Sequence, residues 1–215
     1  LHLSLRRQRQ MCIRDRGTLD LICGLQNPED FAKIPEEESL IISQFPGLPE
    51  LNNGITLSGK LSKLSLLSNK VTDYEISYLE NNDLGIGEED CLPSKGSIYP
   101  HGIDIYEEFS AVGNALSPFV KESSLLAVVN HLEISRIEFF LVFPEYVEFS
   151  DINEPTLFWI GCVKAPEKNT YFNDVVIANE KGDFFVTHQY DKDLGLNPYR
   201  IGAVSYTHLT LPTKA

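Results

Sequence analysis

A polar pair followed by a short apolar strand occurs three times in this chain, at a constant spacing of 72 residues. The pairs are Glu29-Asp30, His101-Gly102 and Asn173-Asp174. In each unit a loop follows, and then a second apolar strand that ends in polar residues; these ends are Ser43-Gln44, Asn130-His131 and Thr187-His188. Self-similarity at a fixed period indicates that one supersecondary unit is repeated along the chain.

The remaining apolar residues form short runs that are rich in β-branched and aromatic side chains and show no sustained helical period. These runs are 39–45, 60–67, 125–130, 137–143, 155–163 and 184–187. The chain is therefore predicted to be all-β. Repeated units of this size suggest four-stranded blades of a β-propeller. The first strand of every blade faces the propeller axis, so polar residues at equivalent strand starts are expected to converge on one point.

Both ends of the chain are interpreted as non-native. Arg6 to Asp15 matches the translation of a transposon-type sequencing adapter, and Val204 to Thr213 matches the opposite strand of the same adapter type. Such segments are excluded from fold reasoning; the alternative is a basic N-terminal arm. Residues 1–16 and 203–215 are then adapter-derived. Residues 17–202 are expected to be the N-terminal part of a propeller domain, about two and a half blades of a longer protein.

The charge excludes two classes of partner. The formal net charge is −13, and removing the two ends, which together carry +5, leaves −18 for residues 17–202. A chain this acidic is repelled by nucleic acid and by anionic membranes. No apolar run approaches the roughly 20 residues of a transmembrane helix. A small molecule or a cation is the expected partner, while localisation and oligomeric state stay open.

Three cysteines lie outside the adapter-like ends: Cys23, Cys91 and Cys162. They show neither the spacing of a zinc site nor a disulfide pattern. We interpret them as packed thiols rather than a redox site. Pairing with a cysteine elsewhere in a longer protein is left open, and so is the redox compartment.

The acidic and amide side chains of the first and third pairs suggest a metal site. Carboxylate and amide oxygens are hard donors, which suit calcium and not zinc or copper. Glu29-Asp30 follows Asn27-Pro28, a combination that also starts helices. Pro35 leaves room for little more than one helical turn, so a strand is favoured.

The histidines of the second unit suggest acid–base chemistry. Alone, His101 resembles a turn residue and His131 an interior residue. In the repeat, His101 lies at the start of the first strand of the second unit and His131 at the end of the second strand of that unit. Two such histidines can form a proton-relay pair beside a metal. His188, at the corresponding end in the third unit, is a weaker candidate. Trp159 is read as a core residue.

Four strings in the expected order carry a family resemblance. They are Asn-Pro-Glu29-Asp30-Phe, Pro-His101-Gly-Ile103, Leu-Ala-Val-Val-Asn-His131 and Asn173-Asp174. Together they resemble the paraoxonase/arylesterase family, within the gluconolactonase and senescence-marker-protein (regucalcin-like) superfamily. The string Thr-Leu-Phe-Trp159-Ile-Gly-Cys162-Val is similar to bacterial members. That family is a six-bladed propeller with two calcium ions, and it hydrolyses lactones and aryl esters.

The resemblance implies a role for each matching residue. Glu29 and Asn173 would bind the catalytic calcium; Asp30, Asp174 and the carbonyl of Ile103 would bind the structural calcium; His101 and His131 would be the histidine pair. The substrate would be a small ester or lactone. The family's further calcium ligands lie in later blades, and the loop from Glu107 to Ser123 is longer than usual. Two rivals remain: a non-catalytic propeller that only binds, and a metal-free relative of strictosidine synthase.

Overall fold

The structure is a computed structural model of the 215-residue chain, and it describes residues 22–47, 57–78, 86–107, 109, 123–144, 154–191 and 207–211. Within these ranges the regular structure consists of β-strands, without a helix. The predicted all-β class is therefore confirmed. None of the described segments forms a helix of the length and apolarity needed to cross a membrane.

The strands follow the expected apolar runs closely. They are β1 (Pro28–Lys33), β2 (Ser39–Gln44), β3 (Lys60–Ser65), β4 (Val71–Asp73), β5 (Glu75–Tyr78), β6 (Pro100–Tyr106), β7 (Ser124–His131), β8 (Ser135–Val142), β9 (Thr156–Lys164), β10 (Thr170–Ile177), β11 (Phe184–Asp191) and β12 (Thr207–Leu211). The segment that follows Asn27 is thus a strand and not the start of a helix. β12 lies in the part of the chain interpreted as adapter-derived.

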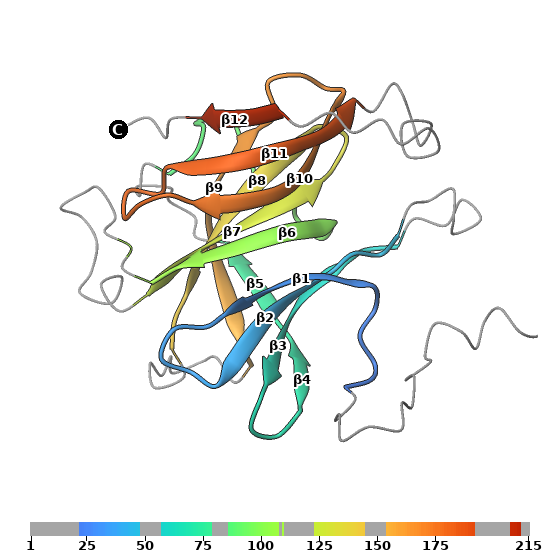
Figure 1. Ribbon diagram of the computed structural model, residues 1–215, viewed down its shortest axis with the longest axis vertical. Helices are drawn as coiled ribbons and strands as arrows, with labels where there is room; N and C mark the ends of the chain where they lie inside the picture. The colour runs from blue at the N-terminus through green and yellow to red at the C-terminus, as the bar shows by residue number, and fades with distance from the viewer. Residues whose placement is uncertain are drawn as a thin grey trace, which may run out of the picture.

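The strands form three sheets, none of them closed on itself (Figure 1). The first sheet has the order β1-β2-β3-β4, the middle sheet β5-β9-β8-β7-β6, and the third sheet β10-β11-β12. Neighbouring strands are antiparallel except β5, which pairs with β9 in parallel. In Figure 1 the third, middle and first sheets follow one another from top to bottom.

The middle sheet is apolar at nearly every position because both of its faces are covered. Along β7, Leu125, Ala127 and Val129 belong to a core shared with the third sheet. The alternate residues Leu126 and Val128 belong to a core shared with the first sheet. Successive side chains of a strand point to opposite faces, so one strand serves two cores. Burying a side chain of this size stabilises the fold by about 1.5–3 kcal/mol.

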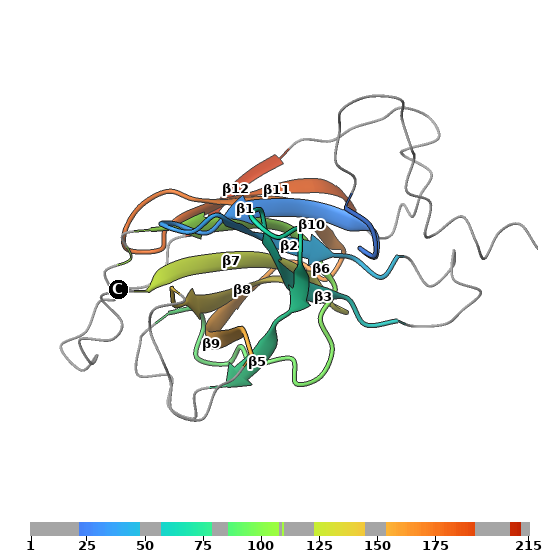
Figure 2. The ribbon, with the colours of Figure 1, turned by 90° about the horizontal axis from the view of Figure 1, so that it is seen from below.

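The first strands of the three repeat units are β1, β6 and β10. They belong to three different sheets and lie side by side, with β6 between β1 and β10 (Figure 1). Strands β9 and β5 lie on the side of the molecule opposite to β1 and β11 (Figure 2). Backbone N–H groups donate to aspartates across sheets at β1, β6 and β10. The N–H of Ile103 donates to Asp30 Oδ2 at 2.9 Å, and the N–H of Ile177 donates to Asp104 Oδ2 at 2.7 Å.

Each first strand is irregular at the same point of the repeat. The register with the second strand shifts between Pro28 and Asp30 in β1, between Pro100 and Ile103 in β6, and between Phe172 and Val175 in β10. Bulges of this kind re-aim side chains and are frequent beside active sites. The three polar pairs of the sequence repeat lie at these three irregularities.

The outer faces of the outer sheets carry exposed apolar side chains. Phe31 on β1 is 64% exposed, Val176 on β10 is 51% exposed, and Phe185 on β11 is 45% exposed. Their strand neighbours Ala32 and Val175 are buried against the middle sheet. The first and third sheets therefore each present a partly apolar face on the side away from the middle sheet.

Candidate functional site

Asp30 and Asp174 are held in the same way on two different sheets. The N–H of Asp30 donates to Ser43 Oγ at 3.0 Å, and the N–H of Asp174 donates to Thr187 Oγ1 at 3.1 Å. In both cases the hydroxyl lies 13 residues further along, on the second strand of the sheet. A bulge disrupts the backbone ladder locally, and the hydroxyl satisfies the aspartate N–H there. The two aspartates are structural equivalents.

Backbone N–H groups orient both carboxylates. Asp30 accepts from the N–H of Phe31 at 2.8 Å through Oδ1, in addition to its bond from Ile103 through Oδ2. Asp174 accepts from the N–H of Val175 at 2.8 Å. Hydrogen bonds to ionised oxygens are about twice as strong as neutral ones. These carboxylates are consequently fixed at the starts of their strands.

Gly102 sets the distance between β6 and β10. A Cβ atom at this position would lie 2.5 Å from both Cα and Oδ1 of Asp174 and 2.7 Å from the backbone oxygen of Asn173. Only glycine permits this approach of two backbones. Sequence reasoning noted Gly102 as a member of the repeat but missed this role. The available signal was a glycine at the position where the other two units carry aspartate.

His101, on β6, contacts residues of both β1 and β10. Its Nδ1 lies 2.9 Å from the backbone oxygen of Asn173 on β10, and its Nε2 lies 3.5 Å from Glu29 Oε2 on β1. Because a carbonyl oxygen only accepts, Nδ1 carries the proton and Nε2 faces Glu29. The side chains of His101 and Glu29 are 19% and 34% exposed. Three of the predicted site residues thus meet here: Glu29, His101 and the backbone of Asn173.

His131 lies against His101, as the repeat predicted. The two ring centroids are 5.1 Å apart in an edge-on arrangement. Tyr171 stacks on His131 at 3.9 Å, and Phe45 contacts both histidine rings edge-on. Sequence reasoning missed Phe45 and Tyr171; their signal was an aromatic residue beside a polar strand end. His188 lies one strand further away, on β11, opposite Phe172.

A further carboxylate, Asp104 on β6, adds to the negative potential of the site. Burial raises the pKa of Asp104, and repulsion from Asp30 acts in the same direction. Burial likewise raises the pKa of Asp174, with repulsion from Asp30 and Asp104 adding to it, although hydrogen bonding by Val175 and the proximity of His101 oppose the shift. Like charges near each other disfavour ionisation. A bound cation would relieve this repulsion.

The donor chemistry fits a hard cation. The side chains of Glu29, Asp30, Asn173 and Asp174 offer carboxylate and amide oxygen atoms as donors, which suits calcium. Among the described residues, no three His, Cys, Asp or Glu side chains form a ready metal-binding group. A site here would therefore draw on an amide and a backbone carbonyl, such as that of Ile103, and on groups beyond the described residues.

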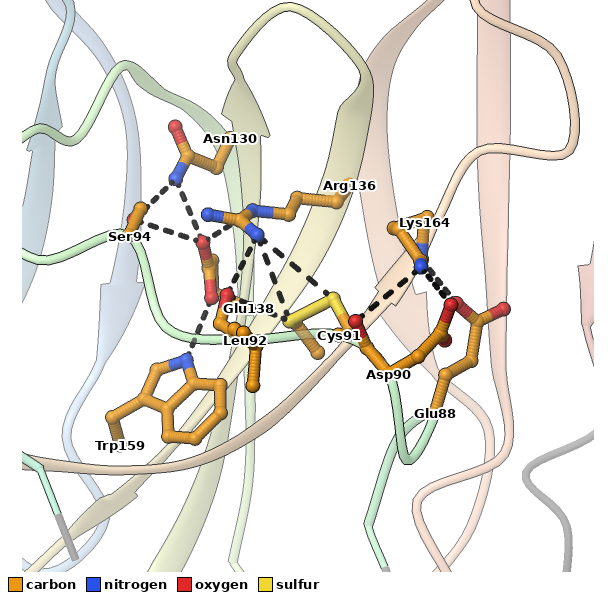
Figure 3. The surroundings of a disulfide bond; sticks show 11 residues. Glu88, Asp90, Cys91, Leu92, Ser94, Asn130, Arg136, Glu138, Trp159 and Lys164 are labelled. Carbon is orange, nitrogen blue, oxygen red and sulfur yellow. Dashed lines mark hydrogen bonds and ion pairs between the residues drawn. A yellow bond between two sulfur atoms is a disulfide. The ribbon is translucent and has the colours of Figure 1, made fainter.

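A second polar cluster lies in the middle sheet (Figure 3). Its centre is Glu138, which is 1% exposed. The carboxylate is surrounded by donors: Ser94 Oγ at 3.1 Å, Asn130 Nδ2 at 2.9 Å, Arg136 Nε at 2.7 Å and Trp159 Nε1 at 2.6 Å. A buried charge requires such pairing. Trp159 belongs to the core, as predicted, and its indole N–H also donates a hydrogen bond to this carboxylate.

The prediction that the cysteines are unpaired thiols is wrong. Cys91 and Cys162 form a disulfide across 71 residues, and Cys23 is disulfide-bonded as well. The segment before β6 runs along β9, where the N–H of Glu88 donates to the carbonyl of Cys162 at 2.8 Å. This packing brings Cys91 and Cys162 together, and it cannot be inferred from cysteine spacing. Arg136 Nη1 lies 3.9 Å from both sulfur atoms (Figure 3).

A cavity of about 320 Å³ lies between the first and middle sheets. Its walls include Tyr78, Glu138 and Trp159, and none of the residues at the three bulges lines it. Glu138 and Trp159 already bond to each other. The cavity is thus separate from the cluster around His101.

No protein-family model matches this chain, and no curated protein matches it either.

Proposed function

We propose that this chain is part of a calcium-dependent hydrolase of lactones or aryl esters. The parent would be a paraoxonase/arylesterase-like member of the gluconolactonase and senescence-marker-protein superfamily. One observation carries the proposal: His101 contacts Glu29 and Asn173 at once, so equivalent points of three successive units meet in one place. Such convergence of oxygen donors and a histidine is what metal-assisted hydrolysis requires.

The proposed architecture is an arc of a six-bladed propeller. The first strands β1, β6 and β10 would face the axis, and each sheet would be one blade. The exposed Phe31 on one outer face and Val176 and Phe185 on the other support further blades on both sides. The third sheet has only three described strands, and β12 would occupy the place of that blade's own third strand.

Glu29 and Asn173 would hold a catalytic calcium, and Asp30, Asp174 and the Ile103 carbonyl a structural one. A bound calcium supplies Lewis-acid polarisation of the ester carbonyl and stabilises the oxyanion that develops. The hydrogen bonds to Asp30 and Asp174 keep these carboxylates oriented. Bulges at the strand starts would direct these donors to one side of the proposed arc.

His101 is suited to take a proton from an attacking water. In the neutral tautomer, with Nδ1–H donating to the Asn173 carbonyl, the lone pair of Nε2 would be available to act as a general base. After proton uptake, the Glu29 carboxylate at 3.5 Å stabilises the imidazolium. His131, whose ring lies against that of His101, would be the second member of the histidine pair. The apolar and aromatic walls from Phe45 and Tyr171 limit access of bulk water.

The test is hydrolysis by the complete gene product on a panel of lactones and aryl esters, with and without chelator. We expect activity that chelation removes and calcium restores. Glu29→Gln and Asn173→Ala should abolish turnover, whereas Glu75→Gln, an exposed carboxylate on β5, is the matched control. Hydrolysis that survives chelation, or that Glu29→Gln leaves intact, would contradict the assignment. Binding of ligands without turnover would favour the non-catalytic module.

A further inference from the structure

Asn130 holds the segment that leads into His101. Its side chain is fully buried. The amide Oδ1 accepts from the N–H of Tyr99 at 2.9 Å, and the neighbouring N–H of His131 donates to the carbonyl of Tyr99 at 3.0 Å. Both backbone groups of Tyr99 are therefore fixed by two successive residues of β7. Tyr99 is two residues before His101 and is separated from it by Pro100.

This attachment matters because the backbone ladder is interrupted nearby. Pro100 pairs in register with Asn130 but has no N–H to donate, and the register is regular again only at Ile103. The part of β6 that bears His101 is therefore not held by regular ladder bonds to β7. The Tyr99 contacts are what couple the start of β6 to the end of β7, where His131 lies.

The orientation of the Asn130 amide is set by Glu138. Nδ2 of Asn130 donates to Glu138 Oε1 at 2.9 Å and to Ser94 Oγ at 3.3 Å, which leaves Oδ1 directed at Tyr99. The Glu138 carboxylate is fixed in turn by Arg136 and Trp159. A buried ion pair contributes little net stability. A role in defining local geometry accounts better for burying Glu138 and Arg136 here.

We propose that Asn130 and Glu138 are positioning residues that set the relative placement of the His101 and His131 rings. The inference rests on the proposed function for its catalytic meaning. Its structural content does not depend on hydrolysis or on calcium. If the amide is lost or turned, Tyr99 is released, and the start of β6 with His101 moves away from His131.

The test is NMR of the 215-residue chain, without calcium. In the unsubstituted chain, a nuclear Overhauser effect between the ring protons of His101 and His131 should be observed, since the ring centroids are 5.1 Å apart. Asn130→Ala and Glu138→Gln should each remove it. The matched control is Val142→Ala at the far end of β8, which removes a buried apolar contact of the same core without changing the contacts of Tyr99, Asn130 or Glu138. It should lower stability and keep the signal.

Retention of the nuclear Overhauser effect between the two rings in both Asn130→Ala and Glu138→Gln would overturn the proposal, and so would its loss in Val142→Ala. If Asn130→Ala and Glu138→Gln do not fold, the milder Ser94→Ala decides in the same way, because it removes one acceptor of the Asn130 amide. In the active longer protein, Glu138→Gln should lower kcat on the order of 10²-fold with KM unchanged. If the longer protein has no hydrolase activity but the NMR result is as expected, the proposed hydrolase function is wrong and the positioning role of Asn130 and Glu138 still stands.

Discussion

Nδ1 of His101 lies 2.9 Å from the backbone oxygen of Asn173, a residue 72 positions later in the chain. This contact joins β6 of the middle sheet to β10 of the third sheet at the bulges of the two strands. The same histidine faces Glu29 on the first sheet. One repeat length along the sequence thus corresponds to one step between neighbouring strands in space.

Gly102→Ala should open this junction. The added methyl group would meet the backbone of Asp174 at 2.5 Å, so β6 and β10 must separate. Overpacking of this kind costs about 1–3 kcal/mol. Urea unfolding measures it, with Ser97→Ala, on the exposed surface of the preceding loop, as the control. An unchanged free energy of unfolding would show that the two strands are not in close contact.

Calcium should stabilise the chain through Asp30 and Asp174. A ligand at 100 times its Kd stabilises the native state by about 2.7 kcal/mol. We expect a rise in Tm on adding calcium, and a much smaller rise in Asp30→Asn and Asp174→Asn. Glu75→Gln should keep the full rise. Thermal melts in calcium, magnesium and chelator provide the measurement, and equal responses of all variants would place the cation elsewhere.

Loss of the Cys91–Cys162 disulfide should destabilise the fold. Closing a loop of this length is expected to contribute about 2–4 kcal/mol, mainly by restricting the unfolded chain. The double variant Cys91→Ser with Cys162→Ser should unfold at lower urea concentration than the parent. Added reductant should lower the urea midpoint of the unsubstituted chain. It should lower the midpoint of the double variant less, because this disulfide is already absent there. Peptide mapping that finds both thiols free in oxidised protein would refute the pairing.

Asp73 should make stability depend on acid pH. Burial raises the pKa of Asp73, but hydrogen bonds from Lys60 and Ser62 outweigh burial and hold the pKa below its usual value of 3.8. A depressed folded pKa means stabilisation above 3.8 that is lost as pH falls through the folded pKa. Asp73→Asn should therefore cost up to about 1 kcal/mol at pH 7. The difference from the parent should vanish in strong acid; a constant difference would exclude this ionisation as its source.

The outer apolar faces should drive self-association of the isolated chain. Phe31→Ser and Phe185→Ser remove the exposed aromatic rings on the two outer sheets. Each should lower the associated fraction in sedimentation experiments, with little loss of stability. Leu67→Ser is the control, because Leu67 is 84% exposed in a turn and not on an outer sheet face. An equal effect of the control would indicate nonspecific association.

The sequence by itself determined the strands and the residues at their starts. The β-branched runs and the 72-residue spacing are local or periodic properties, so they placed Glu29, His101 and Asn173 at equivalent points before any contact was known. They also led to the His101 and His131 pair, whose rings are in contact.

Only the tertiary structure decided how closely the sheets approach and what they enclose. The need for glycine at position 102, the burial of Glu138, the ring contacts of Tyr171 and the pairing of Cys91 with Cys162 all depend on segments that are distant in sequence. No local propensity encodes those distances. They follow from how side chains of separate sheets fill the two cores, and this is settled when the sheets pack together.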